Sequence, residues 1–117
     1  MGFIIRDNTI LEKYQEDGTT EVFIPEGITE IREKAFQECR TIEFVQIPET
    51  VTFIGESAFI DCSNLKKVIM PTGTVLMERS CFMGCHQLQE INFPKQIYAV
   101  YEKEYGIEIL LSAHFII

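Results

Sequence analysis

All four prolines of this chain lie 23 residues apart, at Pro25, Pro48, Pro71 and Pro94. Phenylalanine and cysteine keep the same interval, at Phe36, Phe59, Phe82 and at Cys39, Cys62, Cys85. A fixed period in the twenties is typical of small structural units that cannot bury an apolar face alone and must stack on one another. The spacing therefore predicts a repeat protein in which successive copies share a continuous core.

Apolar residues repeat in columns as regularly as the prolines do. The columns are Val22/Val45/Val68/Ile91, Ile24/Ile47/Met70/Phe93, Ile31/Ile54/Met77/Val100 and Ile42/Leu65/Leu88. A chain of 117 residues with 46% hydrophobic residues can form one core. We therefore expect a single domain over residues 1–117. It comprises an N-terminal hairpin cap (1–21), three full repeats (22–90), and a degenerate fourth repeat with a C-terminal cap (91–117).

Each copy contains three short elements. Residues 65–70, in which Leu65, Val68 and Met70 are apolar, end at Pro71, which predicts a short strand. Residues 51–54 predict a second extended piece, and residues 57–62 a helical or 3₁₀ turn that points Phe59 inward. Stacking such copies would place equivalent strands side by side in a parallel sheet.

The two ends differ from the repeats. FIIR and TILEKY, separated by Asp7 and Asn8, predict an antiparallel hairpin that precedes the first coil. After Pro94, apolar residues fall at helical spacing over 97–105 and are followed by Gly106, which predicts a closing helix. Both ends of the stack are therefore expected to be covered.

Residues 45–68 carry the pattern Ile-Pro-x-x-Val-x-x-Ile-Gly-x-x-Ala-Phe-x-x-Cys-x-x-Leu-x-x-Val, which resembles the BspA-type leucine-rich repeat. The resemblance covers about residues 3–111 and implies a right-handed β-solenoid with short helical turns. It also implies a bacterial surface or secreted protein whose array binds proteins or host components, and it brings no catalytic residues. An extracellular location follows if the chain is part of a longer protein, and a cytoplasmic one otherwise. Gly55 of the pattern is replaced by Arg32 and Glu78 in the other copies.

Charge argues against two classes of partner. The net charge is −8, and only ten Lys and Arg residues are present and scattered, whereas binding to nucleic acid depends on such residues to neutralise phosphates. No apolar run approaches the roughly 18 to 20 residues of a membrane-spanning helix. We therefore expect neither nucleic-acid binding nor membrane insertion.

The four cysteines are predicted to be free, buried thiols. Cys81, Cys85 and His86 have ligand-type side chains, but no second close pair completes the four ligands of a structural zinc site. Cys39 and Cys62 occupy equivalent places about 4.8 Å apart in a parallel stack and point the same way, whereas disulfide formation requires Cβ atoms that face each other. We expect no metal and no cofactor.

Catalytic motifs are also lacking. His86 and His114 are the only histidines, and no Gly-x-Ser-x-Gly, His-Glu-x-x-His or Gly-rich phosphate loop occurs. The acidic residues fall mainly on positions predicted to face solvent. We expect no enzymatic activity, and an active site assembled across several coils is the distant alternative.

Several outward positions of the main sheet are apolar, although a solvent-facing surface is usually polar. This candidate binding face consists of Phe23, Phe44, Lys66, Lys67 and Ile69. Its mixture of apolar and charged groups favours a protein partner, and a glycan-binding or adhesive surface module is the alternative. Single exposed apolar residues are also ordinary in proteins, so only a contiguous patch would indicate an interface.

The segment 107–117 is more apolar than a single edge strand requires. Its candidate self-association residues are Ile109, Leu111, Phe115, Ile116 and Ile117. Three interpretations are open: the segment packs on its own domain, joins a continuation of the array, or forms a homodimer through strand pairing.

Overall fold

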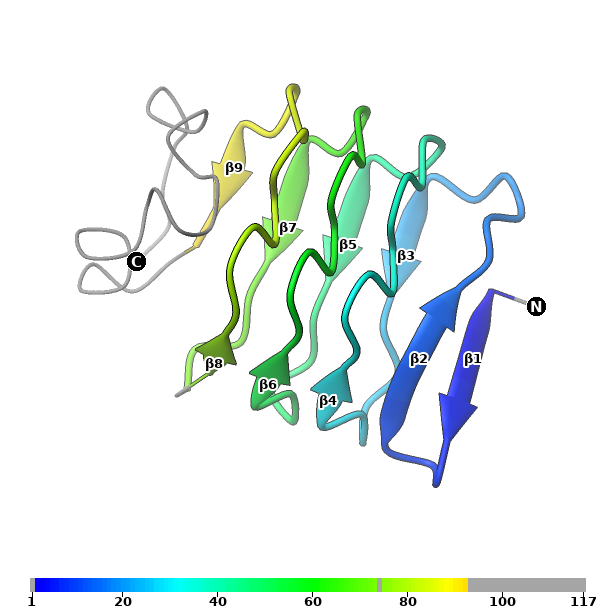
Figure 1. The fold of residues 1–117 in the computed structure, drawn as a ribbon, viewed down its shortest axis with the longest axis vertical. Helices are drawn as coiled ribbons and strands as arrows, with labels where there is room; N and C mark the ends of the chain where they lie inside the picture. Colours follow the sequence, from blue (N-terminus) through cyan, green and yellow to red (C-terminus); the bar gives the residue numbers. More distant parts are fainter. Residues whose placement is uncertain (1, 74, 93–117) are drawn as a thin grey trace.

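The computed structural model describes residues 2–73 and 75–92, which form two sheets joined into a solenoid (Figure 1). The five-stranded sheet has the order β1-β2-β4-β6-β8, and the four-stranded sheet has the order β3-β5-β7-β9. The strands of the first are β1 (Phe3–Arg6), β2 (Ile10–Tyr14), β4 (Glu30–Ile31), β6 (Phe53–Ile54) and β8 (Leu76–Met77). Those of the second are β3 (Glu21–Phe23), β5 (Phe44–Gln46), β7 (Lys67–Ile69) and β9 (Glu90–Ile91).

The 23-residue interval sets the register of both sheets. Each coil contributes one strand to each sheet, and all pairs between coils are parallel. In the four-stranded sheet, Val45 lies between Val22 and Val68, which are its equivalents one repeat away on either side. The prediction of stacked repeats is therefore confirmed over about four coils.

The strands are shorter than the sequence pattern predicts. The strand expected over 65–70 spans only Lys67–Ile69, because the N–H of Leu65 donates to the carbonyl of Cys62 in a turn. The piece expected over 51–54 spans Phe53–Ile54, because the N–H of Val51 donates to Pro48.

Aromatic rings form a continuous stack through the core. The ring centroids of Tyr14 and Phe36 lie 5.0 Å apart, those of Phe36 and Phe59 4.7 Å apart, and those of Phe59 and Phe82 5.4 Å apart. The three phenylalanines are fully buried. The inward residues of both sheets pack around this stack, so the repeated apolar columns line the core as predicted.

The third wall of each coil consists of turns rather than helices. It spans residues 33–38, 56–61 and 79–84, and the expected helical or 3₁₀ turn over 57–62 is wrong. Ser57 and Asp61 have φ values of 57° and 61°, which lie in the left-handed region and interrupt a right-handed helix. No helix occurs in the described ranges 2–73 and 75–92, and so none there is long and apolar enough to cross a membrane.

This turn wall is also bonded from coil to coil. The N–H groups of Ser57, Phe59 and Asp61 donate to carbonyls of the next coil at 2.7–3.0 Å. The intervening N–H groups, such as that of Ala58, donate three residues back within the same coil. In the first two coils, every second amide of the wall therefore bonds to the next coil, and these N–H groups are satisfied without a helix.

Gly55 lies where two coils approach closely on this wall. A Cβ atom at Gly55 would lie 2.5 Å from the backbone nitrogen of Glu33 in the preceding coil. The equivalent Glu78 carries a full side chain, and its Oε1 accepts a hydrogen bond of 3.2 Å from the N–H of Glu56. The Gly in the motif of the second coil is therefore explained by its contact with the first.

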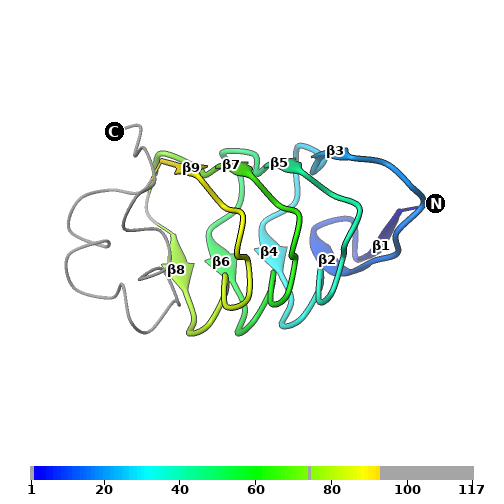
Figure 2. The same cartoon turned by 90° about the horizontal axis from the view of Figure 1, so that it is seen from above.

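The N-terminal segment forms the expected antiparallel hairpin, with β1 paired to β2 around Asp7 and Asn8. Strand β2 then pairs in parallel with β4 of the first coil. Figure 2 shows the hairpin at the N-terminal end of the solenoid. The predicted helix over 97–105, the segment 107–117 and its five candidate self-association residues lie outside the described residues.

Candidate functional site

The outer face of the four-stranded sheet carries two columns of side chains. Because alternate residues of a strand point to opposite faces, Val22, Val45 and Val68 face the core and their neighbours face outward. The outward columns are Glu21/Phe44/Lys67/Glu90 and Phe23/Gln46/Ile69/Asn92. Phe23 and Ile69 thus share a column, and Phe44 belongs to the adjacent one, as the sequence predicts.

An aromatic pair lies at the N-terminal end of this face. The ring centroids of Phe23 and Phe44 are 5.5 Å apart, with an angle of 54° between the ring planes. The side chain of Phe23 is 56% exposed although it is large and apolar. The two rings form one contiguous apolar surface, with Ile69 two strands away from Phe23.

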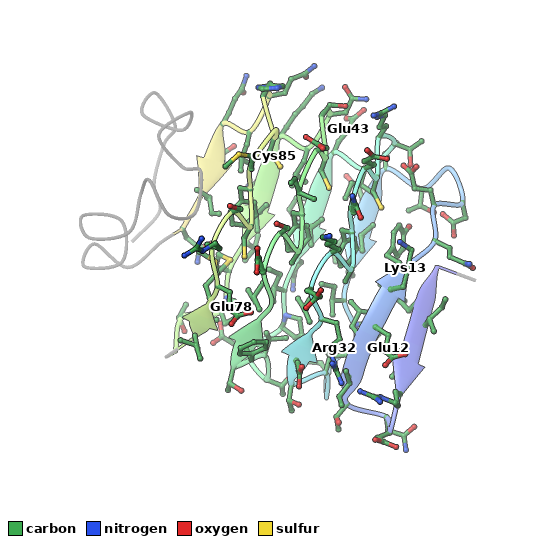
Figure 3. All side chains as sticks on the ribbon, viewed as in Figure 1. Glu12, Lys13, Arg32, Glu43, Glu78 and Cys85 are labelled. Carbon is green, nitrogen blue, oxygen red and sulfur yellow. The ribbon has the colours of Figure 1, made fainter. Side chains whose placement is uncertain are left out.

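The two lysines of the candidate face are paired with acids from neighbouring coils. The Nζ of Lys66 lies 3.7 Å from a carboxylate oxygen of Glu43, and that of Lys67 lies 3.7 Å from one of Glu90. Glu43 immediately precedes β5 and lies on the same side of the solenoid as Cys85, at the top of Figure 3. Such exposed pairs contribute little stability, but they leave the face without a strong positive field. The apolar centre therefore has a charge-balanced rim.

Asn92 occupies the last position of the Phe23 column, and its side chain accepts the hydrogen bond from the sheet that a backbone carbonyl accepts in the other coils. The Oδ1 of Asn92 accepts a hydrogen bond of 2.6 Å from the N–H of Met70, and its Nδ2 donates to the carbonyl of Met70 at 3.0 Å. In the preceding coil, the equivalent N–H of Ile47 donates to the carbonyl of Ile69. Asn92 is therefore committed to the sheet and is unavailable to a ligand.

A second exposed apolar surface was missed by the sequence analysis. On the outer face of the five-stranded sheet, Phe53 of β6 lies beside Leu76 of β8, which is 64% exposed. On its other side, Phe53 has Glu30 of β4 as its neighbour. Phe53 and Leu76 are 23 residues apart, so the alternation rule applied to the second strand could have found them. Charged residues follow toward the hairpin, with Glu12 on β2 and Arg32 directly after β4 (Figure 3).

The cysteines line the core behind the turn wall. All four are free and buried, as predicted. The Sγ atoms of Cys62 and Cys85 lie 3.0 and 3.1 Å from the carbonyl oxygens of Phe36 and Phe59 in the preceding coils. These thiols act as weak donors that link successive coils.

Burial also makes these thiols unreactive. It raises the pKa of Cys39 and of Cys81 to about 12, and the side-chain hydrogen bond with Cys85, together with burial, raises the pKa of Cys62 above its ordinary range. Within the described ranges, no three His, Cys, Asp or Glu side chains come together in a group that could hold a metal ion. The geometry of the thiols is that of core residues.

Solved structures similar to this chain are bacterial leucine-rich repeat proteins. A protein from Bacteroides capillosus ATCC 29799 has a TM-score of 0.69 and 33% identity, covering 78% of this chain and 75% of that one. A T. pallidum leucine-rich repeat protein has a TM-score of 0.68 and 29% identity, covering 73% of this chain. A third, described as a leucine rich cell surface protein from Faecalibacterium prausnitzii A2-165, has a TM-score of 0.62 and 30% identity over 74% of this chain.

This chain is short beside several of these relatives. The match covers 42% of the T. pallidum protein and 27% of the F. prausnitzii protein. No curated relative matches the chain. The family model described as "BspA type Leucine rich repeat region (6 copies)" matches residues 11–107. With the 23-residue coils, the stacked phenylalanines and the buried cysteine column, this match places the chain in the BspA-type leucine-rich repeat family.

Proposed function

We propose that this chain is a non-catalytic protein-interaction module that binds a partner through the outer face of its four-stranded sheet. The observation that carries the proposal is the contact between Phe23 and Phe44 on a face that also carries Ile69 and whose two lysines are paired with acids. Aromatic residues surrounded by a polar rim are the usual anchors of protein interfaces.

Membership in the family supports this function. Leucine-rich repeat proteins are commonly interaction or surface modules and are typically non-enzymatic. One similar protein is described as a cell surface protein, which favours a surface location for this protein as well.

The geometry of the face favours a protein over a glycan. The Phe23 and Phe44 planes are inclined at 54°, so they offer a ridged surface rather than a flat platform for a sugar ring. Ile69 adds an aliphatic contact in the same column as Phe23. A ridged aromatic and aliphatic surface fits apolar side chains of a protein partner.

Immobilised chain should be compared with two variants in a capture experiment on bacterial and host extracts. The double variant Phe23→Ser/Phe44→Ser removes the aromatic pair, and Leu76→Ser removes an equally exposed apolar residue from the other sheet. We expect the first to lose the captured proteins and the second to retain them. Retention by the double variant, or equal loss in both, would refute the assignment to this face.

A further inference from the structure

The two sheets of the solenoid do not begin at the same level. The five-stranded sheet extends beyond β4 by two strands, β2 and β1, whereas the four-stranded sheet starts at β3. Strand β2 lies opposite β3, and β1 forms a further level that has no strand in the other sheet (Figure 2). Among the described residues, β3 is therefore an edge strand with a neighbour on one side only.

The hydrogen-bond pattern identifies the backbone groups at this free edge. The carbonyl of Thr20 and the N–H of Ile24 bond to the β5 side, at 3.1 and 3.0 Å. In a parallel pair, successive residues of a strand bond to opposite sides, so the N–H and C=O groups of Glu21 and Phe23 point to the open side. Four backbone groups are thus available there, and Pro25, which has no N–H, ends the series.

A small hollow lies where the missing strand would be. It has a volume of about 130 Å³ and lies between the hairpin and β3. Its lining is Gly2, Phe3, Tyr14, Asp17, Thr19, Glu21, Val22 and Phe23. A buried apolar cavity of about 150 Å³ accommodates benzene, so this hollow has room for one aliphatic side chain. Phe3 and Tyr14 provide an aromatic wall, with ring centroids 5.4 Å apart.

The rim of the hollow is acidic. Asp17 and Glu21 line it and are exposed, and no Lys or Arg is among the described residues that line it. The Oδ1 of Asp17 accepts hydrogen bonds from the N–H of Thr19 at 3.0 Å and from the hydroxyl of Tyr14 at 3.4 Å, so the carboxylate is fixed beside the hollow. A ligand here must be neutral or positively charged where it crosses the rim.

We propose that β3 binds an extended peptide by strand addition, with one aliphatic side chain in the hollow and Lys or Arg residues beside Asp17 and Glu21. The peptide backbone bonds to Glu21 and Phe23 and supplies the absent strand of the four-stranded sheet. The inference rests on the proposed role in protein binding, but its hydrogen bonds are made by the edge of the sheet, and Phe23 is common to the hollow and the outer face. The apolar segment 107–117 of a second copy lacks Lys and Arg and does not match the acidic rim.

Fluorescence anisotropy with the labelled peptide acetyl-RVLVR-amide tests the proposal. Glu21→Pro removes one free N–H from the edge, and Glu21→Gln is the matched control that removes the charge and keeps the N–H. We expect Glu21→Pro to bind about fivefold more weakly than Glu21→Gln, as the loss of one hydrogen bond predicts. Acetyl-EVLVE-amide should bind unmodified chain at least fivefold more weakly than acetyl-RVLVR-amide.

Peptide variants keep the test independent of folding. Since a strand presents alternate N–H groups to its neighbour, N-methylation of one alternate set should abolish binding and methylation of the other should be tolerated. No binding of acetyl-RVLVR-amide, equal effects of the two methylated sets, or equal affinity for the acidic peptide would overturn the proposal. It would also be overturned if Glu21→Pro converted a dimer of the chain to a monomer, because the edge would then belong to a second copy. The capture experiment on the sheet face can succeed while all these peptides fail, so the two proposals fail separately.

Discussion

Truncating the central ring of the aromatic stack should destabilise the chain more than any surface substitution. Phe59 is fully buried, and its ring has Phe36 on one side at 4.7 Å and Phe82 on the other at 5.4 Å. A buried Phe removes about 150 to 250 Å² from water, worth about 4 to 6 kcal/mol at ~25 cal/mol per Å². Because alanine retains part of this area, we expect Phe59→Ala to lower the free energy of unfolding by about 3 to 5 kcal/mol.

Urea denaturation followed by circular dichroism measures this loss. Phe23→Ala is the matched control, because it removes the same ring from a position that is 56% exposed, and it should cost at most about 1 kcal/mol. A loss below about 1 kcal/mol for Phe59→Ala, or equal losses for the two variants, would mean that the ring stack does not hold the coils together.

Four further predictions concern the turn wall, the thiols and the C-terminal segment. Gly55→Ala should lower the free energy of unfolding by about 1 to 3 kcal/mol, because the new Cβ overlaps the preceding coil. Gly73→Ala is the control and should be near neutral, because nothing lies within 4 Å of a Cβ there. Equal urea midpoints for the two variants would contradict the close approach at Gly55. Since the pKa values of Cys39 and Cys81 are raised from 9.0 to about 12, the folded state binds more protons between these values. The contribution of these two thiols to stability should therefore be fully present below about pH 9 and be lost between about pH 9 and 12. An alkylating reagent at pH 8 should react with the thiols only after urea is added, and rapid labelling of the native chain would argue against their burial. If segment 107–117 pairs with a second copy, light scattering should show a dimer for the intact chain and a monomer after deletion of 112–117; a monomer in both cases would refute self-association.

The repeat interval alone predicted the register of the sheets, because stacking identical coils places each valine beside its equivalent in the next one. The conformation of the turn wall was not predictable in the same way. Residues 34, 57 and 80 all have positive φ, yet they are Lys, Ser and Ser, and residues 38 and 61 are Glu and Asp. Gly84 is the equivalent of residues 38 and 61 in the third coil. Among these six positions, it is the one glycine, the residue type that best indicates a left-handed backbone.

The sequence predicts which side chains lie on the candidate binding face, because side chains along a strand point alternately inward and outward. The outward direction of Phe23 and Ile69 follows from the inward direction of Val22 and Val68, which precede them on the same strands. The pairing of Lys66 with Glu43 was not predicted, because it depends on side-chain conformations across two coils. The hollow beside β3 was also missed, since it depends on the path of residues 15–20 between the hairpin and the first coil.

The close approach at Gly55 has a consequence for how an array of this kind can grow or be recombined. A gene duplication that inserted the third coil directly after the first would bring Glu78 to the place of Gly55, where a Cβ atom overlaps the backbone of Glu33. Duplicating the second coil would instead place a glycine on the next level and avoid that overlap. The coils are therefore similar in outline but not interchangeable in order, and a designer who lengthens this solenoid must transfer each coil together with the neighbour that precedes it.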